Sequence, residues 1–152
     1  MPISEELKIH DSMGLLLPTF ARRVRAVCSE LTNQGFDPMV FETFRTRERA
    51  DILMRQGKSN GADRSFHCLS AAADIISASK HWDHPEFFKA LGEIAQDCGL
   101  VWGGTFKRRD LCHVQAISDR NYNALKSLPT QQRDAYINVI MSANERKPAS
   151  RG

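Results

Sequence analysis

Hydrophobic positions along the chain change period several times, and each change predicts an element. Apolar residues recur every three or four positions over residues 17–34 and again after Pro85, which is typical of amphipathic helices. Three more helices are expected: one capped by Thr46, one after Ser118 and one over residues 130–144. Shorter apolar runs predict strands over residues 39–44, 71–76, 100–102 and 111–117. We therefore expect an α+β fold, with helices packed around strands.

One domain should hold most of the chain. Its 152 residues are enough for a single core, and neither repeats nor low-complexity linkers divide them. We expect that domain to occupy residues 1–146. The polar segment over residues 147–152 contains Pro and Gly and is expected to be a disordered tail.

Charge and composition exclude several classes of protein. The net charge is +3, and Lys and Arg are spread among acidic residues, so we expect no nucleic-acid partner. No apolar run approaches the ~20 residues of a membrane span, and the acidic start does not resemble a signal peptide. We therefore expect a protein made in a cytoplasm. The four cysteines form no CxxC pair, which argues against a disulfide framework.

Two short segments offer the side chains of a catalytic zinc site. His67, Asp74 and His113 would supply three ligands and leave a fourth position for water. Asp110, three residues before the second histidine, could act as the general base. Arg45 follows the first predicted strand and could stabilise a developing oxyanion.

Each of these residues also has a structural interpretation. Asp74 alone could cap a turn, and Arg45 alone could be a surface cation. The spacing from His67 to Asp74 is loose and would arise by chance in many proteins. From the residues alone, a zinc site and an ordinary set of structural side chains therefore both remain open. The other histidines, and the cysteines beside the two histidine ligands, are interpreted as surface, turn or packing residues: His10, His81, His84, Cys68 and Cys112.

Four blocks of sequence resemble one peptidase family. Residues 65–74, SFHCLSAAAD, are similar to the SxHxxGxAxD signature of the zinc D-alanyl-D-alanine carboxypeptidase family, which includes VanY-type enzymes. The blocks WGGTF and DLCHVQ, within residues 102–115, resemble WGGxW and DxxHFQ of its L-alanyl-D-glutamate peptidases from phage endolysins. Upstream, TFRTRER and QGKS resemble GYRSxxRQ and QGRT. The blocks keep the family order between residues 40 and 117.

The resemblance implies a fold and a set of roles. The family fold is a small α+β domain with a central antiparallel sheet, shared with the hedgehog signalling domain. One zinc ion would be held by the two histidines and the aspartate proposed above, and Asp110 would be the catalytic carboxylate. Arg45 would polarise the scissile carbonyl, while Ser65 and Trp102 would contact the substrate. Ser70 stands where the family has Gly, and Cys112 where Pro is common.

The resemblance also implies a function. We expect a monomeric zinc peptidase that cuts the stem peptide of peptidoglycan at L-alanyl-D-glutamate and acts as a phage endolysin. Such an enzyme would be stored in the host cytoplasm and reach the wall after release. The alternatives are a D-alanyl-D-alanine carboxypeptidase and a non-catalytic, zinc-stabilised domain that binds the cell wall.

Overall fold

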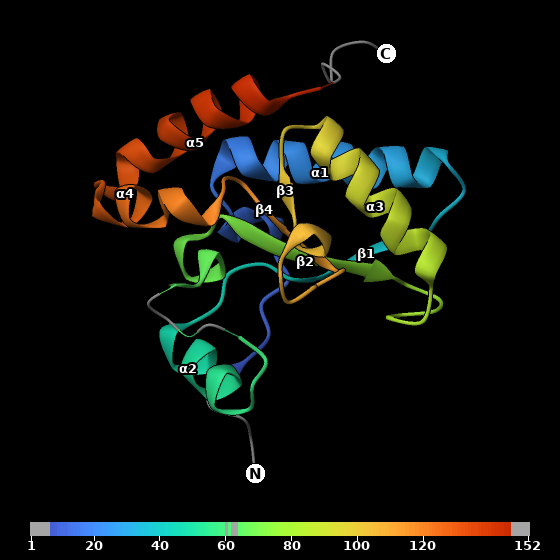
Figure 1. Cartoon of the computed structure of the whole chain (residues 1–152), viewed down its shortest axis with the longest axis horizontal. Coiled ribbons are helices and arrows are strands. Elements are labelled where there is room, and N and C mark those ends of the chain that lie inside the picture. Colours follow the sequence, from blue (N-terminus) through green and yellow to red (C-terminus); the bar gives the residue numbers. More distant parts are fainter. Residues whose placement is uncertain (1–6, 60, 62–63, 147–152) are drawn as a thin grey trace.

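A computed structural model describes residues 7–59, 61 and 64–146 (Figure 1). The tail expected over residues 147–152 lies outside the described residues. Within the described part, one cluster of buried side chains forms the hydrophobic core. No helix in this part combines the length and hydropathy that a membrane crossing requires.

Five α-helices in the described part of the chain follow the predicted pattern closely. Two of them begin with proline at the first helical position, where its missing N–H is not needed. Thr46 caps another, and its side chain accepts a hydrogen bond from the backbone N–H of Arg49. The helices are α1 (Pro18–Asn33), α2 (Arg47–Arg55), α3 (Pro85–Asp97), α4 (Tyr122–Ser127) and α5 (Thr130–Asn144).

Among the residues that the structure describes, four strands form one antiparallel sheet with the order β1-β2-β4-β3. They are β1 (Pro38–Glu42), β2 (Ala72–Ser77), β3 (Val101–Trp102) and β4 (His113–Gln115). The expected central antiparallel sheet is thus confirmed. β4 is shorter than the predicted run over residues 111–117, because Leu111 and Cys112 lie in the turn that precedes it.

Helices are distributed unequally about the sheet. α1, α3 and α5 lie on one side of it, whereas α2 lies apart from them on the other side (Figure 1). Side chains alternate along a strand, so the buried Ala73 and Ile75 of β2 project to the face opposite that of Asp74. The Asp74 face is therefore left for functional side chains between the sheet and α2.

Candidate metal centre and active site

Strand register brings three polar side chains into one row. In the antiparallel pairs, Asp74 of β2 lies opposite Glu42 of β1 on one side and opposite His113 of β4 on the other. Opposed residues project from the same face of a sheet with Cβ atoms about 5 Å apart. All three are buried, with exposures of 1%, 8% and 8% for Glu42, Asp74 and His113. The row therefore places a carboxylate beside an imidazole at the centre of the sheet.

His67 reaches the same place from a short 3-10 segment, Phe66–Leu69, just before β2. Ser70 ends this segment in the left-handed conformation, at φ 58°, and turns the chain into the strand. Glycine adopts this conformation without strain, which gives a physical reason for the family's Gly at the position of Ser70. The turn folds His67 back over β2 toward Asp74.

The three predicted ligands converge. His67 Nε2 and His113 Nδ1 each lie 3.3 Å from Asp74 Oδ1. Each of the three residues offers one potential ligand atom, and these atoms all lie within 4.8 Å of one another. Among the described residues, no other group of three or more His, Cys, Asp or Glu side chains meets this condition. Cys68 and Cys112 adjoin the ligands in sequence but do not belong to the group.

The outer nitrogens of both imidazoles have acceptors as partners. His67 Nδ1 donates to the carbonyl oxygen of Thr43 at 2.7 Å, which leaves Nε2 without a proton in the neutral ring. The Gln115 amide donates through its nitrogen to the Ile117 carbonyl and to Asp119, so its oxygen faces His113 Nε2 at 2.8 Å. That nitrogen must carry the proton, which leaves His113 Nδ1 free.

The protonation of the two imidazoles and the position of the carboxylate decide whether the site suits a metal ion. Two unprotonated nitrogens and a carboxylate oxygen point at one small volume, and their lone pairs repel one another unless a cation lies between them. Histidine ligands whose other nitrogen donates to a carbonyl or an amide oxygen are characteristic of protein zinc sites. The donor set of two nitrogens and one oxygen also suits Zn²⁺ and leaves a coordination position open. The residues therefore fit a catalytic zinc ion.

Electrostatics within the cluster favour an ionised aspartate. Burial alone would raise the pKa of Asp74, but the charge and hydrogen bonds of His67 and His113 hold that pKa well below its usual range. Burial alone would lower the pKa of His113, whereas its hydrogen bond with Asp74 and the aspartate charge raise it. A proton held on His113 must leave before a metal ion can bind.

A buried ion cluster lies beside the proposed ligands. Glu42 accepts hydrogen bonds from Arg45 Nη2 and Arg49 Nε, both at 2.7 Å. Burial alone would raise the pKa of Glu42, but these two guanidinium groups lower it. The same hydrogen bond and charge outweigh burial and raise the pKa of Arg45. Glu42 therefore holds two cations at the edge of the site.

Arg45 is positioned to act on something outside this cluster. Its Nη2 lies 3.7 Å from Asp74 Oδ2, which places the charge next to the proposed metal ligands. Its Nε is buried and has no hydrogen-bond partner among the described residues. An unpaired buried donor costs about 1–3 kcal/mol, a cost that a bound oxygen atom would remove. The guanidinium therefore offers a donor to a ligand.

Asp110 lies on the loop between β3 and β4. Its backbone N–H donates to the carbonyl of Gly103, and its own carbonyl accepts from the N–H of His113, at 3.0 and 3.2 Å. The Cys112 thiol donates to Asp110 Oδ1 at 3.4 Å. The carboxylate is exposed and lines the same cavity as the ligand cluster.

That cavity measures about 510 Å³ and brings together six of the seven predicted site residues. Ser65 lies in its wall and is 7% exposed. Among the described residues, four cations line the cavity, one just before α2, one in α2 and two in the segment that follows: Arg45, Arg49, Lys58 and Arg64. The carboxylates that line it are Glu42, Asp74, Asp110 and Asp119.

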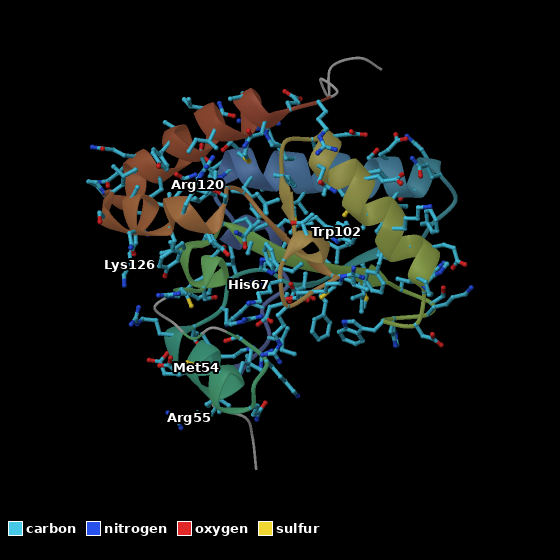
Figure 2. The ribbon with its side chains drawn as sticks, in the orientation of Figure 1. Met54, Arg55, His67, Trp102, Arg120 and Lys126 are labelled. Carbon is cyan, nitrogen blue, oxygen red and sulfur yellow. The ribbon has the colours of Figure 1, made fainter. Side chains whose placement is uncertain are left out.

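Trp102 is the predicted site residue that does not line this cavity. Its ring lies against α3, where a Cβ atom added to Gly92 would overlap with it, and its Nε1 donates to the Leu111 carbonyl at 2.8 Å. Figure 2 labels Trp102 and His67 at separate places in the molecule. These contacts give Trp102 a packing role, and its contact with substrate remains a prediction.

Four residues that support the site were missed from the sequence. Gln115 follows His113 by two positions, the spacing that places two strand residues on one face, so this signal was present. Glu42 and Arg49 flank Arg45 on either side, but nothing in the sequence indicates that their charges are buried together. The Thr43 carbonyl that orients His67 carries no sequence signal, because every residue has one.

The comparisons with known proteins agree with this site. A family model described as D-alanyl-D-alanine carboxypeptidase matches residues 58–116, which include all three proposed ligands. The peptidoglycan L-alanyl-D-glutamate endopeptidase CwlK of Bacillus subtilis is 27% identical over 123 aligned residues, covering 67% of this chain and 74% of the relative.

Two solved structures share the fold. The Serratia marcescens L-Ala D-Glu endopeptidase ChiX has a TM-score of 0.56 and 24% identity, over 78% of this chain and 96% of that protein. The LdcB LD-carboxypeptidase has a TM-score of 0.50 and 14% identity, over 84% of this chain and 68% of that protein. The resemblance carried by the four sequence blocks is therefore confirmed: residues 58–116 match the D-alanyl-D-alanine carboxypeptidase family model, and the chain is similar to an L-alanyl-D-glutamate endopeptidase.

Proposed function

We propose that this protein is a zinc-dependent peptidase that hydrolyses the L-alanyl-D-glutamate bond in the stem peptide of peptidoglycan. The observation that carries the proposal is the convergence of His67 Nε2 and His113 Nδ1 on Asp74 Oδ1, with the other nitrogen of each ring held by an acceptor. A structural zinc site is normally closed by four protein ligands, whereas three ligands are characteristic of catalysis.

The residues around the cluster supply the remaining functions of a peptidase. When bound, a zinc ion acts as a Lewis acid and makes water a stronger acid. Asp110 would accept the proton of the attacking water and return it to the leaving amine. Arg45, which lines the cavity, would donate a guanidinium N–H to the carbonyl oxygen as negative charge develops there. Glu42 would keep that guanidinium fixed without neutralising both arginines.

The charge distribution in the cavity suits an acidic peptide. The cations beside α2 would attract the free carboxylates that follow the scissile bond in a stem peptide. The names of the relatives CwlK and ChiX both specify L-alanyl-D-glutamate cleavage, which supports this bond over D-alanyl-D-alanine. The role of phage endolysin rests on the likeness of the WGG and DxxH blocks to that branch.

Two alternatives are distinguished by chemistry. The description of the matched family model favours D-alanyl-D-alanine cleavage, which would release free D-alanine from the end of the stem. A non-catalytic wall-binding domain would bind zinc and peptidoglycan but release nothing. It would have no need of Asp110 or of a buried Arg45 beside the metal ligands.

Digestion of purified peptidoglycan tests the proposal. The zinc-loaded protein should release new amino groups. Asp110→Asn should retain its zinc, but its rate of release should fall about 10²- to 10⁴-fold, the usual contribution of a general acid–base group. Glu93→Gln is a control, because Glu93 is an exposed carboxylate of α3 that does not line the cavity. Unchanged release by Asp110→Asn would remove Asp110 from the mechanism, and no release by the zinc-loaded wild type would refute the proposal.

A further inference from the structure

The cavity has an aromatic end that the proposed mechanism does not use. Among the large hydrophobic side chains exposed in the described residues, only Trp82 lines the cavity, with 54% of its surface exposed. Its ring packs edge-to-face on Phe41 of β1, with ring centroids 4.9 Å apart and planes at 79°. This contact fixes the plane of the indole and leaves much of its surface open to the cavity.

The backbone that carries Trp82 is held firmly. Asp37 accepts hydrogen bonds from the Ser77 hydroxyl at 2.8 Å and from the Ser79 N–H at 2.9 Å. Ser77 and His81 then form an isolated bridge, with His81 in a left-handed conformation at φ 52°. An exposed indole on such a constrained turn would lose little entropy when it binds a ligand.

The position of Trp82 relates it to the reaction centre. Trp82 lines the same cavity as Cys112, the residue before the proposed ligand His113. The segment 78–84 that carries it follows β2 and lies at the far end of the sheet from α2 (Figure 1). The cavity therefore has a cationic end beside α2 and an aromatic end beside Trp82.

We propose that Trp82, steadied by Phe41, binds the amino sugar to which the stem peptide is attached. A sugar ring presents a face of C–H groups surrounded by hydroxyls, and indole offers a flat apolar surface with one N–H donor. The L-alanine before the proposed scissile bond is joined to the sugar through a lactyl group. The sugar then lies about two residue lengths from the reacting carbonyl, roughly 7 Å.

This assignment orients the substrate and rests on the proposed function. The acidic part of the stem, after the scissile bond, would lie toward the cations beside α2, and the glycan toward Trp82. A terminal D-alanyl-D-alanine bond lies several residues further from the sugar, beyond the reach of one such cavity. Recognition of the sugar would therefore also contribute to the choice of bond.

Two substrates test the inference: a stem peptide linked to its disaccharide and the same peptide without sugar. The wild type should prefer the sugar-linked peptide by about tenfold in kcat/KM, which corresponds to roughly 1.4 kcal/mol. Trp82→Leu should reduce this ratio to near one, whereas Trp82→Phe should keep part of it. The control Val139→Ala changes an exposed residue of α5, 71% exposed, and should keep the full ratio.

A binding measurement separates this inference from the proposed function. The two tryptophans give two indole N–H signals in an NMR spectrum, and Trp82→Phe assigns one of them. The disaccharide alone, at millimolar concentration, should shift the Trp82 signal and leave the Trp102 signal in place. If that signal moves and neither peptide is cut, the proposed function fails while the sugar site stands. If it does not move, or if Trp82→Leu keeps the preference, the inference is overturned.

Discussion

Asp74 lies directly opposite His113 in the antiparallel pair of β2 and β4, and its Oδ1 is 3.3 Å from His113 Nδ1. This pairing follows from strand register alone, because opposed residues share one face of the sheet. His67 completes the group from a separate segment of chain. Two of the three proposed ligands are thus built into the sheet, and the third depends on the turn before β2.

Removing a ligand should abolish the response to zinc. The wild type should contain about one zinc ion per chain, and zinc at 100 times its dissociation constant should stabilise the fold by about 2.7 kcal/mol. His113→Ala should lose both properties, as measured by metal analysis and thermal unfolding with and without zinc. His81→Asn is the matched control, because His81 is exposed and left-handed, a conformation that Asn tolerates. Full zinc content in His113→Ala would contradict the ligand set.

Gln115 should control zinc affinity without touching the ion. Its amide oxygen accepts a hydrogen bond from the N–H of His113 Nε2, which keeps Nδ1 free for the metal. Gln115→Leu should weaken zinc binding about 10- to 100-fold, the usual effect of losing such a partner. Competition with a chelator at constant pH measures the change. An affinity equal to that of the wild type would mean that the ring is oriented by other contacts.

Acid should destabilise the protein partly through Glu42. Its pKa is lowered below the ordinary 4.5, so the ionised form stabilises the fold above that pH. This stabilisation is lost as the pH falls through the lowered folded-state pKa. At pH 7, Glu42→Gln should lose about 3–5 kcal/mol of stability, because the buried Arg45 and the partly buried Arg49 lose their partner. Urea unfolding at pH 7 and pH 3 should then show a smaller loss of unfolding free energy on acidification in Glu42→Gln than in the wild type. Equal losses would exclude Glu42 as a source of the acid sensitivity.

Gly103 should be required to position Asp110. A Cβ atom at Gly103 would overlap with the carbonyl oxygen of Asp110, whose N–H bonds to the Gly103 carbonyl. We expect Gly103→Ala to lower kcat at least tenfold and to cost about 1–3 kcal/mol of stability, as overpacking does. Gly14→Ala is the control, since a Cβ there meets only a Ser12 hydroxyl at 3.6 Å. A fully active Gly103→Ala would show that the loop adapts.

Sequence patterns predicted the elements well and the site in part. The period of apolar residues located α1 and α5 to within a residue or two, because packing against one core imposes that period. The ligands and Arg45 followed from motif chemistry. The burial of the Glu42 cluster was not predictable, because Glu42 is buried by the pairing of β1 with β2, which its local sequence does not reveal. Trp102 was assigned to the substrate from its motif, whereas the tryptophan that lines the cavity is Trp82.

The identity of the cleaved bond tests the central proposal most directly. Zinc-loaded protein should be incubated with a defined stem peptide attached to its disaccharide, and the fragments identified by mass spectrometry. We predict one cut, which leaves L-alanine on the sugar and releases a peptide that begins with D-glutamate. Release of free D-alanine, or an intact substrate in the presence of zinc-loaded protein, would contradict the proposal.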